Sequence, residues 1–381
     1  MMRVKRLLIL LISLVVSGLA AAQEYEAMVN GRDTIYYNYM PVEQLSKPQN
    51  FTTSFSIAPL YTPATSFAIA GSLEGRYLTK KSENSVFSVA AMASVRGMYS
   101  VDVGNVNYFN KGKHRLEVSA SALSMPTKFW GIGYNAAIQN SAINYKKRHY
   151  SADVEYLCRI AKGFYMGSQI GVDYARYIDD SGSISTLLPD AAKNELIATT
   201  ISLVTKYDTR DSEYNPQKGL YITMRPFVRP KQLSTAEQTS FGVEASVAGY
   251  QKLWKGATIA AELYALLGSQ YTPWQFYAKV GDSHRMRGYY QGQFMDRNLV
   301  TLQAEISQNI WKGLGVAIWA GAGNCFSGFD AFSWTQTLPT YGLGLRWVTK
   351  ENLVLRFDYG FGAKVGGKLI NAPLFSVGRA F

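Results

Sequence analysis

Hydrophobic and polar residues alternate through most of the chain after residue 50, and the alternation predicts a long series of β-strands. The clearest segment is 298–311, where Val300, Leu302 and Ile306 fall on one side and Glu305 falls on the other. A period of two is what a strand shows when one face meets an apolar medium and the other a polar one. The chain is therefore predicted to be all-β.

Fifteen segments of this kind can be delimited. They are residues 51–60, 66–79, 85–100, 112–124, 144–160, 163–177, 196–208, 218–230, 238–253, 257–268, 298–311, 314–325, 338–349, 352–362 and 373–381. Single-chain bacterial barrels prefer even strand counts. One more strand is therefore expected, either before residue 60 or within 126–143.

Two architectures fit such strands, a membrane β-barrel and a soluble β-sandwich. Arginine and aspartate recur in mid-strand, as Arg356 and Asp358 do, which suits a water-filled lumen. Closing the sheet also removes the free edges of many long strands. The chain is 13% aromatic and ends on Phe381, which is typical of the closing strand of an outer-membrane barrel. These features favour the barrel, with the sandwich as the alternative.

The first residues predict export. Residues 1–22 combine a basic start, a short apolar core and a small-residue cleavage site, which is the pattern of a signal peptide. An uncleaved membrane anchor is the alternative, although the apolar run is short for a spanning helix. Residues 23–50 are predicted to form a short periplasmic segment, and 51–381 a single barrel domain in the outer membrane of a Gram-negative type cell.

The composition offers little for catalysis or for nucleic acid. The formal net charge of +12 is dispersed without a Lys/Arg run, so no nucleic-acid partner is expected. The histidines and the two cysteines, Cys158 and Cys325, lack metal-ligand spacing. We predict no enzyme, no metal and no cofactor.

The acidic group Asp208, Arg210 and Asp211 could serve acid–base chemistry. A turn is the better interpretation, because Asn215, Pro216 and Gly219 follow with the residue types that turns require. We therefore predict a strand end and a hairpin at this position.

The segment before 298–311 is too long and polar for a tight hairpin, and it contains Arg287-Gly288-Tyr289. A guanidinium on a loop that folds into a lumen suits a bidentate pair with an inward carboxylate. Glu305 and Asp358 are the predicted partners. Gly288 would let the backbone approach the wall, and Tyr289 would fill space beside it. The alternative is a solvated loop whose arginine has no specific partner.

These residues resemble the BamA/TamA-type superfamily of outer-membrane barrels, also called the bacterial surface antigen family. Arg287-Gly288-Tyr289 looks like its Arg-Gly-aromatic signature, with five strands remaining. Residues 208–219 look like its Asp-Thr-Arg-Asp…Asn-Pro…Gly hairpin. The segments 342–346 and 355–360 are similar to its closing strands, and 130–133 to a weaker element.

The resemblance implies a sixteen-stranded antiparallel transmembrane β-barrel with a long lumen-inserted loop. The loop arginine pairs with acidic wall residues in this family, and Glu305 matches the first of them. In the element that carries the second acid, Gly321 takes the place of the carboxylate, so we expect the contact to shift to Asp358. Residues 23–50 are also too few for the POTRA domains of the family's insertases, so a POTRA-less member is expected.

The function implied is outer-membrane protein assembly or translocation, through a weakly closed seam between the first and last strands. Outer-membrane lipid and other outer-membrane proteins, as clients or complex subunits, are the expected partners. A passive channel or a scaffold subunit of a complex is the competing interpretation. A hydrolase is disfavoured because no nucleophile motif is present.

Overall fold

A computed structural model describes residues 51–79, 82–179, 182–188, 194–212, 215–348 and 354–377. The predicted signal peptide 1–22, the segment 23–50 and the closing residue Phe381 lie outside the described residues. Their roles remain predictions.

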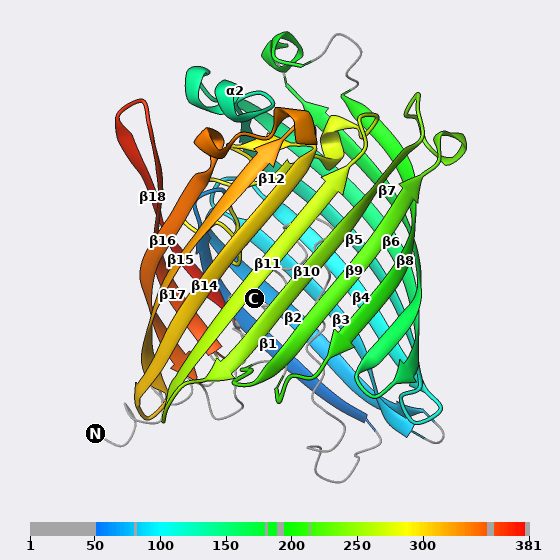
Figure 1. Ribbon diagram of the computed structural model, residues 1–381. Helices are drawn as coiled ribbons and strands as arrows, with labels where there is room; N and C mark the ends of the chain where they lie inside the picture. The colour runs from blue at the N-terminus through cyan, green and yellow to red at the C-terminus, as the bar shows by residue number, and fades with distance from the viewer. Residues whose placement is uncertain are drawn as a thin grey trace.

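Sixteen antiparallel strands form one closed barrel (Figure 1). Each pairs with its neighbours along the chain, and β1 meets β18 to close the ring. The strands are β1 (Phe51–Thr62), β2 (Ser66–Thr79), β3 (Ser82–Ser94), β4 (Tyr99–Phe109), β5 (His114–Phe129), β6 (Ile143–Ala161), β7 (Phe164–Ile178), β8 (Glu195–Asp208), β9 (Gly219–Arg229), β10 (Ser240–Lys252), β11 (Ala257–Gly268), β14 (Asn298–Trp311), β15 (Leu314–Phe326), β16 (Leu338–Val348), β17 (Val354–Val365) and β18 (Lys368–Val377).

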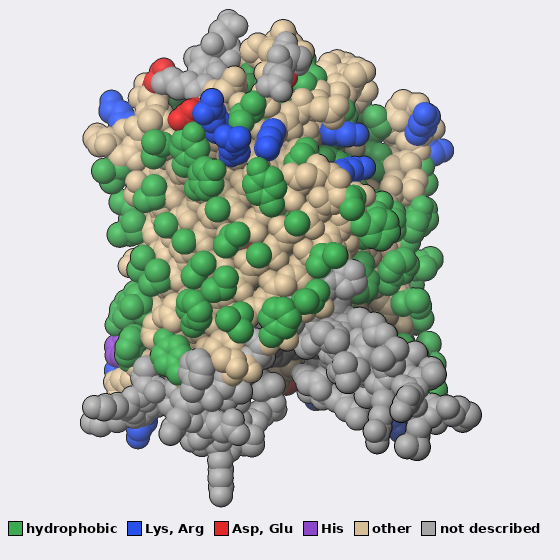
Figure 2. All heavy atoms as spheres, turned by 180° about the vertical axis from the view of Figure 1, so that it is seen from behind, with side chains coloured by type: hydrophobic (Ala, Val, Ile, Leu, Met, Phe, Trp, Pro, Cys, Tyr) green, Lys and Arg blue, Asp and Glu red, His purple; other side chains and the backbone are tan. Residues whose placement is uncertain are grey.

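The alternation in the sequence separates the outside of the barrel from the inside. On β14, Leu302 and Ile306 point outward and are exposed, whereas Thr301, Gln303 and Glu305 point inward and are buried. Figure 2 shows the outward apolar side chains as a broad belt across one face of the wall. A polar interior within a closed ring excludes the two-sheet sandwich, whose centre would be apolar.

The two ends of the barrel differ in their connections. At one end, here the short-turn end, turns such as 162–163 and 312–313 join neighbouring strands. At the other, the long-loop end at the top of Figure 1, the connections include 130–142, 269–297 and 327–337. Long connections gather at one end in outer-membrane barrels.

The sixteenth strand was hidden inside a predicted longer one. The predicted strand 85–100 divides into most of β3, a turn and the first residues of β4. Gly97 makes this turn possible, since its φ of +80° lies in the left-handed region that favours glycine. Its amide donates to the Ser94 carbonyl at 3.0 Å.

The two positions expected for that strand were therefore wrong. Residues 51–59, the described residues before 60, belong to β1, and 126–143 contains the end of β5 and the short helix α2 (Tyr134–Gln139). No helix in the described part of the chain is long and apolar enough to cross a bilayer.

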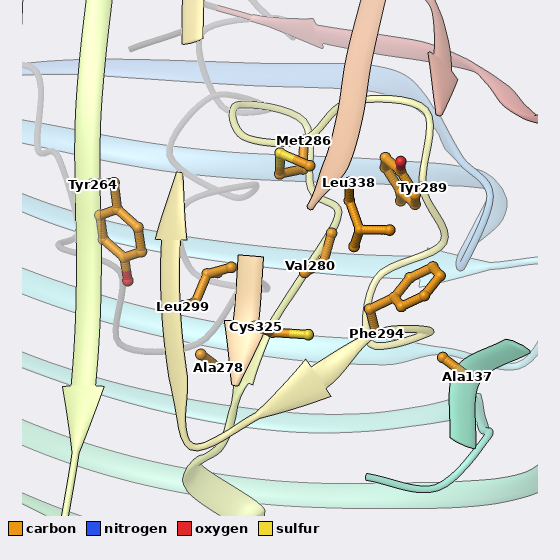
Figure 3. Close-up of a cluster of buried hydrophobic side chains, with 10 residues drawn as sticks. All are labelled: Ala137, Tyr264, Ala278, Val280, Met286, Tyr289, Phe294, Leu299, Cys325 and Leu338. Carbon is orange, nitrogen blue, oxygen red and sulfur yellow. The ribbon is translucent and has the colours of Figure 1, made fainter. Parts of the chain in front are cut away.

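The connection 269–297, here called the inner segment, packs against inward-facing side chains of the wall. It contains the two short strands β12 (Ala278–Lys279) and β13 (Met295–Asp296), which pair with each other. Its apolar side chains form a buried cluster with residues of the surrounding strands (Figure 3). The cluster consists of Ala137, Tyr264, Ala278, Val280, Met286, Tyr289, Phe294, Leu299, Cys325 and Leu338.

The outward position of Leu343 can be tested in a bilayer. Leu343 is 60% exposed at the middle of β16, opposite Ile318 and Tyr359. A cation at mid-membrane on a barrel's lipid face costs about 2–4 kcal/mol, so Leu343→Arg should lower the unfolding free energy in lipid vesicles by that amount. Trp334→Arg, in the connection 327–337, is the control and should change it little. Equal effects of the two substitutions would contradict the placement.

Candidate functional site

Arg287 lies at the centre of a buried ionic cluster between the inner segment and the wall. Its side chain is 0% exposed. Nη1 donates at 2.8 Å to a carboxylate oxygen of Glu305 on β14 and at 2.8 Å to one of Asp358 on β17. The fold thus brings both predicted acidic partners to the same nitrogen of Arg287.

Two wall arginines complete this cluster. Arg346 on β16 lies 2.9 Å from Glu305 and also bonds Asp358. Arg356 on β17 lies 3.8 Å from Asp358, and its Nη2 donates at 2.8 Å to the Ser283 carbonyl of the inner segment. The ionic cluster therefore comprises Arg287, Glu305, Arg346, Arg356 and Asp358.

The charges within the cluster do not cancel. Three guanidiniums and two carboxylates leave a formal charge of 3 − 2 = +1. Removing Arg287 would leave both carboxylates bound to Arg346. Removing Asp358 would leave three cations around one anion, and unpaired buried charge is strongly destabilising. The two carboxylates are therefore the indispensable members.

Trp319 on β15 covers the Arg287 guanidinium from one side. The central carbon of the guanidinium lies 3.8 Å from the centre of the indole ring, a cation–π contact. Gly342 on β16 makes room for the indole, because a Cβ at this position would come within 2.4 Å of the ring. Glycine in the closing strands thus has a packing role beside the ionic cluster.

Gly288 is where the inner segment touches the wall backbone. Its φ is +104°, and a Cβ there would lie 2.7 Å from the carbonyl carbon of Gly360 on β17. A Cβ on Gly360 would lie equally close to Arg287. The Thr340 hydroxyl donates to the Arg287 carbonyl at 2.8 Å. Two facing glycines therefore let the backbones approach closely enough for Arg287 to reach its partners.

Tyr289 bonds two neighbouring strands through one hydroxyl. It donates to the Pro339 carbonyl of β16 at 2.6 Å and accepts from the Ala363 amide of β17 at 2.7 Å. Burial raises the pKa of Tyr289, so the phenol stays protonated and continues to donate. Gly362 leaves the space that the ring fills.

A second ionic anchor, which sequence reasoning missed, lies on β11, the strand next to β14. Arg285 donates to Glu262 on β11 at 2.8 and 3.1 Å and stacks on the Tyr264 ring at 3.8 Å. Ser246 and Gln303 also donate to the Glu262 carboxylate. The alternation of hydrophobic and polar residues along β11 indicates that Glu262 points inward. The sequence alone does not show that Glu262 lies close to Arg285.

The predicted hairpin motif shapes the β8–β9 connection at the short-turn end. Arg210 donates to Asp208 at 2.7 and 3.0 Å. The Asp211 carboxylate accepts from the amides of residues 217 and 218, and Gly219 adopts a φ of +111°. This motif organises a turn and does not join the ionic cluster.

The weaker family element at 130–133 does contact the inner segment. The Trp130 ring lies 5.3 Å from that of Tyr290, and the Gly133 amide donates to the Met295 carbonyl at 2.9 Å. The connection between β5 and α2 thus also supports the inner segment.

A cavity of about 140 Å³ remains between the inner segment and the inward faces of β6–β11. At about 30 Å³ per water it would hold a few molecules. Lys147 and Lys279 both line it, and burial lowers the pKa of Lys279 to about 8. Among the described residues, no group of three or more His, Cys, Asp or Glu side chains could hold a metal ion.

The sequence comparison decides the family. Residues 103–381, well over half the chain, match the Omp85 superfamily domain. The chain belongs to the Omp85 superfamily. The resemblance inferred from the motifs is thereby confirmed. A search of curated proteins finds no match.

Solved Omp85 structures share the fold of this Omp85 barrel. BamA from Haemophilus ducreyi lacking POTRA domains 1–3 superposes with a TM-score of 0.60 at 10% identity, covering 87% of this chain and 71% of that one. CdiB from Acinetobacter baumannii superposes with a TM-score of 0.56 at 11% sequence identity, and CdiB from Escherichia coli with a TM-score of 0.58 at 12% identity. Each CdiB alignment covers 87% of this chain, but only 60% and 63% of the respective CdiB chain.

The charge count of the ionic cluster predicts unequal effects of two substitutions. Asp358→Asn should lower the unfolding free energy by about 3–5 kcal/mol, because it leaves three buried guanidiniums around the single carboxylate of Glu305. Arg287→Met should cost less, since both carboxylates keep Arg346, but it should make the inner segment sensitive to protease. Heat-dependent gel migration of the detergent-solubilised variants would compare their stability, and limited proteolysis would detect exposure of the inner segment.

Arg210→Met provides the control, because it removes a guanidinium from the β8–β9 connection instead. Unchanged protease resistance of the inner segment in Arg287→Met would contradict an anchoring role for this residue.

Two glycines with similar positive φ angles, Gly288 and Gly292, allow the effect of backbone strain to be distinguished from the effect of a steric clash with the wall. Gly288→Ala should expose the inner segment to protease, because its Cβ meets the Gly360 backbone at 2.7 Å. Gly292→Ala has a similar φ of +82°, but its Cβ would meet only the Lys279 side chain, at 3.5 Å. It should have a much smaller effect, and equal cleavage of the two variants would show that the close approach is unimportant.

Proposed function

We propose that this Omp85 barrel acts in the outer membrane in protein assembly or translocation, and that the seam between β1 and β18 is where it acts. The long-loop end would face the cell surface, as in other outer-membrane barrels. The inner segment would stay anchored by the ionic cluster and support the strands beside the seam.

The pairing of β1 with β18 carries this proposal. The register pair described between them is Tyr61 with Phe375, whereas β2 pairs with β1 along all twelve residues of that strand. Since β1 ends at Thr62, residues 368–373 of β18 extend beyond it and have β17 as their strand neighbour in the described part of the chain. In Figure 1 the β17–β18 hairpin stands beyond the neighbouring strands.

An unpaired strand edge can bind another strand. Its free N–H and C=O groups form a ladder with an incoming extended segment, and the side-chain pockets add selectivity. Among the described strands, the upper half of β18 offers such an edge beside the lipid-facing wall. A client strand that pairs there would enter the membrane with its backbone groups satisfied, which the bilayer requires.

The inner segment is in contact with the seam. Tyr290 and Phe375 both pack against a buried cluster that includes Leu60 of β1 and Leu355 of β17. A smaller cavity of about 40 Å³ lies between the end of β1 and residues 281–283. A change in the position of the inner segment would therefore act directly on the strands that meet at the seam.

Locking the seam tests the proposal. Tyr61→Cys with Phe375→Cys, after replacement of Cys158 and Cys325, places two thiols on register partners, whose Cβ atoms typically lie about 4.5–5.5 Å apart. In a strain depleted of the native protein, the oxidised variant should fail to restore the levels of other outer-membrane barrels, and reductant should rescue it. Quantitative outer-membrane proteomics provides the measurement.

Leu263→Cys with Leu302→Cys is the control, because these partners on β11 and β14 lie in a fully paired part of the wall. It should support assembly with or without reductant. Full function of the oxidised seam variant would overturn the proposal. A large, steady single-channel conductance of the native barrel would favour the competing channel function.

A further inference from the structure

Basic side chains gather on the outward faces of two neighbouring strands near the long-loop end. Alternation along β6 and β7 turns Lys146, Arg148 and Arg176 outward, away from the buried Tyr145 and Tyr177. We call these three residues the outer basic cluster. Figure 2 shows a row of lysine and arginine side chains across the upper part of this side of the barrel, above the apolar belt.

The register of β6 and β7 shows at what depth the cluster lies. Successive outward pairs change from basic to aromatic to aliphatic along the strands. Below Lys146 with Ile178, the outward pair nearest the long-loop end, they are Arg148 with Arg176, Tyr150 with Tyr174, Ala152 with Val172, and Val154 with Ile170. Each step is two residues, about 7 Å along a strand. Tyrosine marks the membrane interface, so the arginine pair lies at headgroup level.

The two arginines face each other without enough negative charge between them. Like charges directly opposite on antiparallel strands are destabilising. Arg176 lies 3.9 Å from Glu195, but these side chains are 51% and 53% exposed, and such pairs are weak. Arg148 forms no ion pair with any carboxylate in the described part of the chain. An anion between the arginines would remove the repulsion.

The cluster is specific to this side of the barrel. On β9, β10, β11, β14, β15 and β16, all of whose residues are described, no outward-facing position carries a charged side chain. A general rim of lysine and arginine would have spread over those strands as well. Lys128 on β5 adds another exposed cation beside the cluster.

We propose that Lys146, Arg148 and Arg176 bind the phosphate groups of a phosphorylated lipid headgroup in the leaflet at the long-loop end. Guanidinium forks hold phosphate oxygens in pairs, and an ammonium beside them adds charge without a fixed direction. The stacked rings of Tyr150 and Tyr174, 5.7 Å apart, lie directly below and would contact the upper part of the lipid. The occupant is a lipid because the apolar wall continues without interruption beneath the site, where acyl chains pack.

Native mass spectrometry of the full chain in detergent tests this site, with bisphosphorylated lipid A as the probe. Arg148→Gln with Arg176→Gln should weaken binding at least tenfold. Lys113→Gln with Lys162→Gln removes the same charge from exposed turns at the short-turn end and should leave binding unchanged. Lipid A stripped of its phosphates should bind weakly, and equally, to all three proteins.

Thermal unfolding separates loss of the site from loss of the fold. Without lipid, the Arg148→Gln/Arg176→Gln protein should unfold no earlier than the native chain, because the repulsion is gone. Added lipid A should raise the unfolding temperature of the native chain and of the Lys113→Gln/Lys162→Gln control, but not that of the arginine variant. Equal lipid binding by all variants would overturn the proposal. Full competition by millimolar inorganic phosphate would overturn the assignment to a lipid.

Discussion

One buried guanidinium ties together parts of the barrel that the strand ladder does not connect directly. Arg287 bonds Glu305 on β14 and Asp358 on β17, two strands separated in the wall by β15 and β16. Buried carboxylates need partners, and Arg346 satisfies both of them from the wall itself. The inner segment can therefore dock onto an acidic pair that is already positioned, and its position depends on that pair.

Small residues make this arrangement possible. Gly288, Gly360 and Gly342 leave the space in which the backbone of the inner segment and the Trp319 indole approach the wall. A sheet with larger side chains at these positions would hold the guanidinium away from its carboxylates. The ionic cluster therefore requires the glycines of the closing strands as well as its charged side chains.

The outer surface follows from a different constraint. Lipid-facing positions are apolar over most of the wall, because no water is present there to solvate charge. The pair Arg148 and Arg176 departs from this pattern at one level and on one side. The single register pair between β1 and β18 in the described part of the chain is the other departure. Both lie on the lipid-facing surface, where the barrel can meet molecules of the membrane.

Alternation alone predicted an all-β chain, which face of each strand is polar, and the inward positions of Glu305 and Asp358, because a strand has a fixed period of two. It did not separate β3 from β4, since the turn at Gly97 interrupts the pattern for only a few residues. The family motifs pointed to Arg287, although Gly321 stands where the second acid was expected.

Only the closed tertiary structure decided which charges meet. Arg346 on β16 meets Glu305 on β14, and Arg285 of the inner segment meets Glu262 on β11. Arg356 on β17 bonds the Ser283 carbonyl of the inner segment. These distances depend on barrel closure and register. Local sequence determines where a side chain points. It does not determine what lies opposite, because that depends on how every intervening strand pairs.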